Sequence, residues 1–368
     1  DYFRLDVLNF RGPDIPLEES DIFTSTIGNI NYYTAYVGMI MGFCASLFLT
    51  AKKKIRIVWY YICMVVSFFA IIMGCSDNAY FAIAALFGLI PFAVFRNREC
   101  VNRYLVMLAS FFTVVLCIDR VNRAFGDKVI GLDSLFKVIT SFGGLVYLVA
   151  LLWAVAIGFW YYGKKKNLES GNCGNRFIYA WGIFSFIVLL GIVFVLFDAN
   201  VAGHGERYGA ARNYLVFSKH WGSERGYIWG ASVKLYQEFS WVKKLFGYGP
   251  DTFGILTTQN IIYEMTRVTN KLYDCAHNEY LHYLLTIGIA GTAAYLVFLW
   301  ASIRYMWKNW KKNPYIMGSL GAVLCYAFQA IINNSLPLMT PMMWLLLSIG
   351  VAGCRTSKGE ASKKDGVA

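Results

Sequence analysis

The sequence has few charged residues, and long windows contain none of them. Asp, Glu, Lys and Arg make up 15% of the 368 residues, while 57% are hydrophobic. One charge at mid-bilayer costs about 2.5 to 3.5 kcal/mol, and about 20 apolar residues cross the bilayer as a helix, so such windows indicate membrane spans. Nine occur, at 29–51, 57–76, 78–95, 104–118, 138–162, 177–197, 280–303, 314–332 and 337–354. They exclude a disordered chain or an ordinary soluble domain and predict an all-α, polytopic transmembrane helix bundle of about nine spans.

Metal-binding spacings are also missing from the sequence. The nine cysteines and four histidines include no CxxC pair and no HxxxH pair. These spacings are typical of zinc sites and redox motifs, and nothing here suggests a disulfide framework. We therefore expect no metal ion and no other cofactor.

The charged residues that are present predict how the chain crosses the membrane. If the windows alternate in direction, one set of connections holds 19 basic and 4 acidic residues, and the other holds 15 basic and 18 acidic ones. Lys and Arg are retained on the cytoplasmic side, so the first set should be cytoplasmic. This topology explains the net charge of +12, and no nucleic-acid partner is expected. We expect a multi-pass membrane protein whose first set of connections faces the cytoplasm.

This topology divides the chain into five parts. We expect an extracytoplasmic segment at 1–28, six spans within 29–197, a large extracytoplasmic catalytic loop at 198–276, three spans within 277–354, and a cytoplasmic tail at 355–368. A loop of this length is uncommon unless it has a function. The chain begins with Asp1, and no basic stretch precedes an apolar one there, so we expect it to begin inside a longer protein.

Two stretches of the long loop could bind an anion. Ser223 and Glu224 resemble a helix start, which would place Arg225 in the first turn and Trp229 beside it four residues later. A helix N-terminus with a guanidinium is suited to phosphate, although an exposed arginine on a surface helix is the alternative. The glycine-rich stretch 247–254 is a turn, with a phosphate-binding nest as a second possibility.

The stretch from His277 to Gly291 predicts a rigidly held histidine at the outer end of a membrane helix. With about 100° per residue, Gly288 returns to within about 20° of His277, and Gly291 lies about 40° to the other side. Glycines on that face would let a neighbouring helix approach closely. Glu279 and His282 would lie about 160° and 140° away, so neither should orient His277. The alternative is a polar residue tolerated at the membrane interface.

Four other arginines near expected span ends face the outside in this topology. They are Arg120, Arg123, Arg207 and Arg212. Each could serve an anionic substrate, and each could equally be a solvated charge or one that faces lipid headgroups.

The pattern His277, Asn278, nine residues, Gly288, two residues, Gly291 resembles the signature of the bacterial O-antigen ligase and polysaccharide polymerase family of polytopic membrane glycosyltransferases. The stretches ERGYIW, GYGPDTF and GNINYYTAYV are similar to others that recur in the family, and the likeness extends over roughly 28–350. Family members have about twelve spans, so nine here would leave three upstream ones in the full protein.

The resemblance implies transfer of a glycan from a polyprenyl diphosphate carrier, such as undecaprenyl diphosphate, to a glycan or lipid-glycan acceptor. The reaction would take place on the outer face of the cytoplasmic membrane, without a metal ion and with inversion at the anomeric carbon. His277 would be the general base, because an imidazole with a pKa near 6.5 accepts a proton at neutral pH. Arg225 would stabilise the leaving diphosphate, with Trp229 and Asn278 as further substrate-binding candidates. The second arginine that the family uses could be any of the four named above.

The stretch GCSDN departs from a common family pattern, because Asp77 and Asn78 stand where many members carry Ser and Arg. This favours a polymerase slightly over a ligase. A transporter or flippase for a lipid-linked sugar and a non-catalytic membrane scaffold are the other classes. The absence of charges inside the spans favours the enzyme over a transporter, and a scaffold leaves the His277 motif unexplained.

Overall fold

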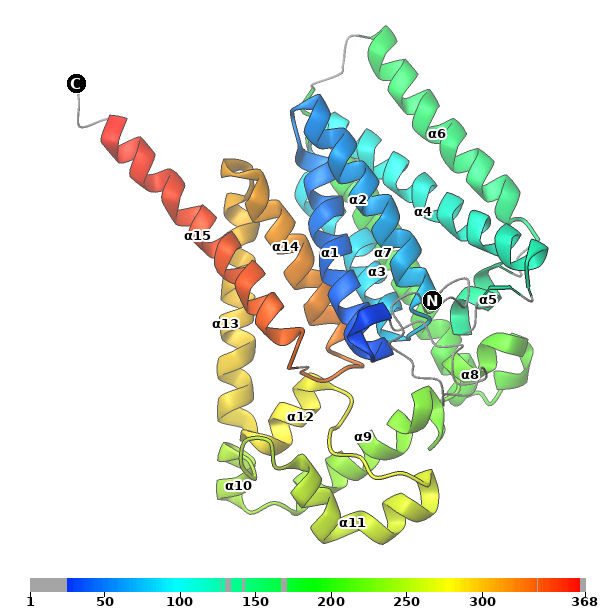
Figure 1. The fold of residues 1–368 in the computed structure, drawn as a ribbon, viewed down its shortest axis with the longest axis vertical. Helices are drawn as coiled ribbons and strands as arrows, with labels where there is room; N and C mark the ends of the chain where they lie inside the picture. The colour runs from blue at the N-terminus through cyan, green and yellow to red at the C-terminus, as the bar shows by residue number, and fades with distance from the viewer. Residues whose placement is uncertain are drawn as a thin grey trace. The chain divides into compact units, whose positions relative to one another are not determined.

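A computed structural model describes residues 25–126, 128–129, 134–140, 143–166, 171–335 and 337–364. Within these residues the chain forms helices and no strand, and one isolated antiparallel bridge joins Asn97 to Asn172 (Figure 1). The expected all-α class is confirmed. The α-helices are α1 Ile30–Thr50, α2 Lys54–Met73, α3 Asn78–Val94, α4 Arg98–Ala124, α5 Ser134–Thr140, α6 Leu145–Lys165, α7 Arg176–Asn200, α8 Arg212–Leu215, α9 Trp221–Glu238, α10 Trp241–Phe246, α11 Phe253–Thr269, α12 Glu279–Thr286, α13 Gly288–Asn309, α14 Pro314–Gln329 and α15 Thr340–Lys364. Short 3₁₀ helices lie at η2 Ser25–Ile27, η3 Gly205–Ala211 and η4 Trp310–Lys312.

Helices lie at all nine uncharged windows. Several of these helices are long and apolar enough to span a membrane, as expected for a polytopic protein. By length and composition, six helices in the described residues could cross a membrane: α1, α2, α4, α6, α7 and the Gly288–Lys312 helix formed by α13 and η4. The apolar helix α3 is shorter. The window 280–303 is divided between α12 and α13, a break that the hydropathy pattern does not reveal.

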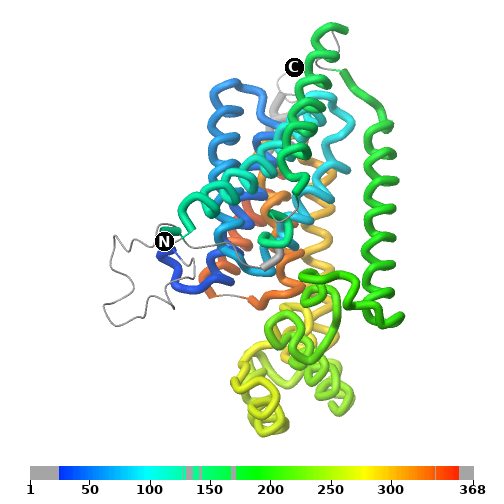
Figure 2. Tube along the Cα trace, turned by 90° about the vertical axis from the view of Figure 1, so that its right-hand side faces the viewer, coloured from blue at the N-terminus to red at the C-terminus, as the bar shows by residue number. Residues whose placement is uncertain are grey.

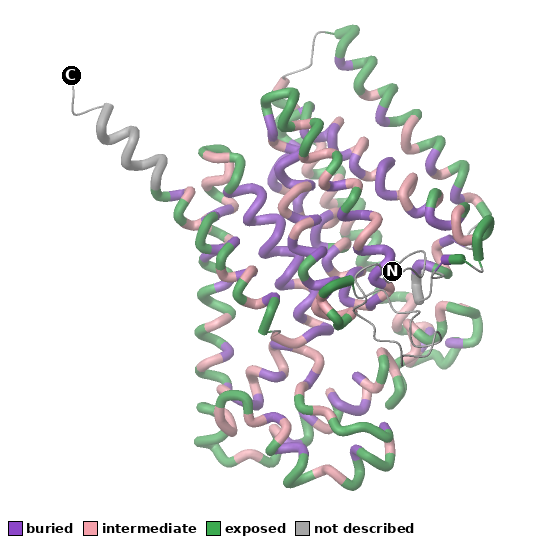
Figure 3. Tube along the Cα trace, in the orientation of Figure 1, coloured by how far each residue is buried: buried purple, intermediate pink, exposed green. Residues whose placement is uncertain are grey.

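The helices belong to two compact units. Unit 1 contains Asp1–Ile187, Ile303–Phe328 and Pro337–Ala368, and unit 2 contains Val188–Ser302 and Gln329–Leu336. In unit 1, α1 and α14 carry much of the buried surface (Figure 3). Met39 of α1 and Leu320 of α14 are fully buried.

The helix α7 is a straight apolar helix in which Ala199 is the one residue that is buried (Figure 2). Near its start, the ring of Trp181 contacts the rings of Phe95 and Tyr104. None of its most apolar window is buried, in contrast with 78% for α1. A helix that exposes apolar side chains on most of its surface is unfavourable in water but favourable in lipid. The exposed surface of α7 therefore agrees with a membrane-embedded protein.

The stretch GNINYYTAYV, which carries part of the family resemblance, meets the stretch GCSDN, which departs from it, in unit 1. Ser76 Oγ donates to Asn31 Oδ1 at 2.9 Å, and Asn78 Nδ2 donates to the Asn31 carbonyl at 3.3 Å. Asn78 is fully buried. It therefore joins the start of α3 to the start of α1.

Unit 2 has its own hydrophobic core, built from the helices of the long loop. The core residues come from α9, α11, α12 and the segment before α12: Tyr227, Ile228, Leu235, Phe253, Leu256, Met265, Ala276 and Leu285. This core gives the loop a fixed structure, so side chains on α9 and before α12 are held in place.

Candidate active site

Arg225 lies at the start of the regular part of α9. The three residues before it, Gly222, Ser223 and Glu224, have left-handed backbone angles, with φ of 60°, 58° and 72°. The regular helix thus begins after the Ser223–Glu224 pair, and the Tyr227 N–H is bound to the Lys219 carbonyl at 2.8 Å. Arg225 occupies the first turn, as the sequence predicted.

The guanidinium of Arg225 is buried and anchored. Its residue is 7% exposed, so the alternative of an exposed surface arginine is wrong. Nε donates to the Ile332 carbonyl at 3.1 Å, and Nη1 donates to the Gly222 carbonyl at 2.6 Å. The carbonyls of Gly222 and Ile332 hold the guanidinium in one orientation before any ligand binds. Such preorganisation lowers the entropy cost of binding and favours the stabilisation of a negative charge.

His277 lies before α12 and not within it. Its φ is 47°, and Asn278 is the N-cap of α12, with extended backbone angles and with Oδ1 accepting the Leu281 N–H at 3.0 Å. The predicted helical face shared by His277, Gly288 and Gly291 is therefore wrong, because the helix begins after the histidine. The substrate-binding candidate Asn278 serves here as a helix cap.

The imidazole of His277 is partly buried beside Arg225. Its ring meets the ring of Tyr273 edge-on, with centroids 5.5 Å apart, and its Nδ1 is buried without a hydrogen-bond partner in the described residues. Burial and, to a smaller extent, the positive charge of Arg225 lower the pKa of His277 to about 4, although the charge of Asp274 partly opposes them. The imidazole is thus neutral at pH 7 and able to accept a proton.

The backbone on both sides of His277 is fixed by hydrogen bonds. Trp229 Nε1 donates to the Ala276 carbonyl at 3.0 Å, which accounts for the tryptophan four residues after Arg225. On the other side, the Glu279 N–H lies 2.9 Å from the Ala330 carbonyl and 2.7 Å from the Asn333 carbonyl. His277 is therefore held by contacts of its backbone, and not by helix packing as the sequence suggested.

The segment 330–333 is the feature that links the two candidate catalytic residues. Its carbonyls accept hydrogen bonds from Arg225 Nε and from the N–H of Glu279, two residues after His277. Ile332 and Asn333 are 3% and 2% exposed. Sequence reasoning missed this segment because a backbone carbonyl leaves no trace in the residue type.

Glu279 is a buried residue of the site for which the sequence predicted no role. It is fully buried at the first position of α12, and its Oε1 accepts a hydrogen bond from the Tyr295 hydroxyl at 2.6 Å. An acidic residue in the first turn of a helix is favourable, and a buried carboxylate needs donors. Its position directly after His277 and Asn278 is the feature of the sequence that could have indicated a place in the site.

Gly288 marks the break between α12 and α13. Its φ is 69°, and a Cβ there would lie 2.4 Å from the Leu245 carbonyl oxygen and 2.5 Å from Gly247 N. The atoms that require a glycine at position 288 thus belong to the C-terminal end of α10 and to the glycine that follows it. The nearest atoms around Gly291 are those of Ile287.

The GYG turn at 247–249 binds the end of α12 through its backbone. The Tyr248 N–H donates to the Leu285 carbonyl at 2.8 Å, and the Gly249 N–H donates to the Thr286 carbonyl at 2.9 Å. These amides satisfy carbonyls at the helix C-terminus, which lack partners within the helix. Because they are already bonded, they do not form the phosphate-binding nest that was the second possibility for this turn.

The other predicted arginines are mostly bound to carboxylates. Arg207 lies 3.8 Å from Asp198, Arg212 lies 3.1 Å from Glu206, and the side chains of both arginines are more than half exposed. In unit 1, Arg123 pairs with Asp119 at 3.0 Å, and Arg120 is exposed on α4. Among the five candidate arginines, Arg225 is the one whose charge acts on His277.

The segment 132–296 matches the O-antigen ligase family, Wzy_C. The matched residues include Arg207, Arg212, Arg225 and His277, while Arg120 and Arg123 lie before the match. No curated protein matches the chain, and no solved structure matches it. The predicted resemblance to the O-antigen ligase and polysaccharide polymerase family is confirmed over residues 132–296, and together with the apolar helices it indicates an integral membrane protein.

Proposed function

We propose that the protein is a membrane glycosyltransferase that transfers or polymerises polyprenyl-diphosphate-linked oligosaccharides on the outer face of the cytoplasmic membrane. The acceptor hydroxyl attacks the anomeric carbon, the bond to the diphosphate breaks, and the configuration inverts. His277 accepts the hydroxyl proton, and Arg225 stabilises the negative charge that develops on the leaving diphosphate. The acceptor is a second glycan in a polymerase, which we favour slightly, or a lipid-glycan in a ligase.

The observation that carries this proposal is a buried, anchored Arg225 whose binding segment, residues 330–333, also holds the backbone just after His277. The Nδ1 atom of His277 is buried, so Nε2 is the nitrogen left for the acceptor hydroxyl. A pKa of about 4 describes a weak base when no substrate is bound. A bound diphosphate would offset the positive charge of Arg225, which is one of the causes that lower the pKa of His277. The pKa of His277 would therefore rise, and His277 would become a stronger base, when the donor is bound.

The test is an assay of the purified protein with a lipid-diphosphate oligosaccharide as donor. His277→Ala and Arg225→Ala should abolish glycan transfer while the protein still inserts into the membrane. Matched controls are His220→Ala and Arg267→Ala, two exposed positions on the same loop that should retain activity. Normal transfer by either active-site variant would remove that residue from the mechanism.

The same assay separates the remaining alternatives. Elongation of the donor alone identifies a polymerase, and transfer only to an added lipid-glycan identifies a ligase. A transporter or scaffold would show no transfer in detergent, where no second compartment exists. A chelator should leave the rate unchanged, and strict dependence on a metal ion would contradict the displacement described above.

A further inference from the structure

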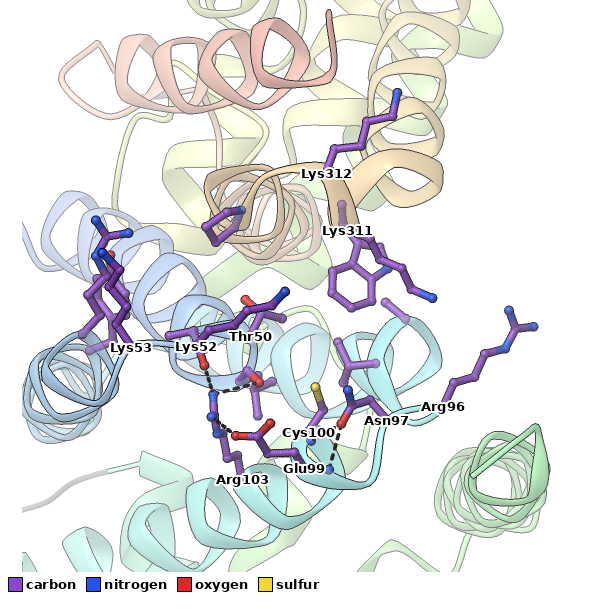
Figure 4. A pocket seen from close by; sticks show the side chains of 18 of the residues that line it. Thr50, Lys52, Lys53, Arg96, Asn97, Glu99, Cys100, Arg103, Lys311 and Lys312 are labelled. Carbon is purple, nitrogen blue, oxygen red and sulfur yellow. Dashed lines mark hydrogen bonds and ion pairs between the residues drawn. The ribbon is translucent and has the colours of Figure 1, made fainter. Parts of the chain in front are cut away.

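Unit 1 contains a basic cavity of about 690 Å³ outside the site described above. It is bordered by three helix turns: α1 to α2, α3 to α4, and α13 through η4 to α14. Six basic side chains contribute to its lining: Lys52, Lys53, Arg56, Arg96, Lys311 and Lys312. Figure 4 labels five of them, Lys52, Lys53, Arg96, Lys311 and Lys312, on the different turns that contribute to the lining. The cavity thus collects cations from parts of the sequence up to 260 residues apart (312 minus 52).

Among the described residues, few acidic groups oppose the positive charge of this cavity. Glu99 is the acidic residue in the lining, and it pairs with a seventh cation, Arg103. Arg96 Nε binds the neutral Asn175 Oδ1 at 2.9 Å. No ion pair in the described residues involves any of the six. Like charges gathered around a hollow repel one another and focus a positive potential, which an anion would relieve.

The floor of the cavity is rigid because Arg103 is built into it. This residue is 8% exposed, and its Nη1 donates to the Phe48 carbonyl at 3.0 Å and to the Ala51 carbonyl at the C-cap of α1. Its Nη2 binds Glu99 (Figure 4). Arg103 therefore satisfies carbonyls at the end of α1 that would otherwise compete for the lysines.

We propose that this cavity binds the headgroup of an anionic phospholipid. The six cations suit phosphate, and the apolar part of the lining, which includes Leu49, Val94 and Trp310, suits the glycerol and upper acyl groups. Its size is within the range of ligand sites, about 300 to 1,000 Å³. Four of the helices that these turns join, α1, α2, α4 and the Gly288–Lys312 helix, are long and apolar enough to cross a bilayer, so lipid is the anion expected beside them.

The predicted topology agrees with a lipid as the ligand. All six residues belong to the connections expected on the cytoplasmic side, where the leaflet carries anionic lipids. A phospholipid with two phosphates, such as cardiolipin, could contact several turns at once. Bound in this way, it would join three helix pairs of unit 1 and stabilise their packing.

The experiment compares two variants that remove the same number of lysines. The cavity variant combines Lys52→Gln, Lys311→Gln and Lys312→Gln. The control combines Lys164→Gln, Lys165→Gln and Lys166→Gln, three exposed positions at the end of α6 on the same expected face. The full chain is purified in detergent, and binding of cardiolipin, phosphatidylglycerol and phosphatidylcholine is measured by native mass spectrometry and by the shift in melting temperature.

The native chain should bind the two anionic lipids in preference to phosphatidylcholine. The cavity variant should bind them about 100-fold more weakly, because each basic residue near an anionic headgroup contributes about a factor of five. The control should change by less than about tenfold, as expected for screened surface charges. Replacing the same three cavity lysines by arginine should restore binding.

Three outcomes would overturn the proposal. These are equal losses in the cavity and control variants, no preference for anionic lipid, and protection by inorganic pyrophosphate as strong as that by lipid, which would identify a free anion. If the first cavity variant fails to fold, the pair Lys53→Gln and Arg56→Gln tests the same cavity from exposed positions. Unchanged lipid binding in that pair would count against the site.

Discussion

The coupling of His277 to Arg225 predicts an unusual pH dependence of the reaction. A general base works only when it is unprotonated, so kcat/KM falls as the pH drops through the pKa of the base in the free enzyme. Because the pKa of His277 is lowered to about 4, the acid limb should lie near pH 4. At pH 5.5 about 97% of the imidazole would be unprotonated, against about 9% for a histidine with the ordinary pKa of about 6.5. The enzyme should therefore lose little activity between pH 7 and pH 5.5.

Arg225→Gln tests the cause of this low pKa. Removing the positive charge removes one of the two contributions that lower the pKa of His277, while burial, the larger one, remains. The acid limb should move to higher pH but stay below 6.5. The rate itself should fall about 100-fold to 1,000-fold, as expected when one donor to a developing negative charge is lost.

Two measurements check this prediction. The first is kcat/KM from pH 3.5 to 8 with a sugar-linked diphosphate donor, whose phosphates do not titrate in the upper part of that range. The second is the rate at which diethyl pyrocarbonate modifies His277, followed by peptide mass spectrometry. This reagent attacks the neutral imidazole, so the measurement does not depend on enzymatic activity. An acid limb near pH 6.5 in the native protein, or one unmoved by Arg225→Gln, would refute the coupling.

Three further substitutions test how the site is held. Trp229→Phe removes one hydrogen bond, worth about 1 kcal/mol, so kcat should fall roughly fivefold with little change in KM; the exposed Trp241→Phe is the control, and equal effects would deny Trp229 a positioning role. Gly288→Ala should lower the melting temperature by several degrees, because its φ is 69° and a Cβ would meet backbone 2.4 Å away, whereas Gly158→Ala has open space and should not. Asn278→Ala should cost about 1 kcal/mol of stability as a lost N-cap; a rise in KM with unchanged stability would instead indicate substrate binding.

Long-range contacts explain where sequence reasoning about the site failed. Helical periodicity predicts that His277, Gly288 and Gly291 share one face of a single helix. In the structure, α12 begins after the histidine and ends before Gly288. The break depends on backbone contacts with the GYG turn, about 40 residues earlier in the chain. Periodicity describes one helix at a time, so it cannot show that a distant turn interrupts it.

The charge-free windows were sufficient to predict the all-α membrane fold, and the His277 motif was sufficient to predict the family resemblance that residues 132–296 show. They are local properties, since the cost of placing a charge in lipid depends on the residue and its depth, and the motif is a fixed spacing of residue types. Only the tertiary structure decided that Arg225 is buried, that its charge acts on His277, and that residues 330–333 hold the chain around both. These features arise from backbone carbonyls and burial contributed by segments about 50 to 100 residues apart, and no residue type in the sequence records them.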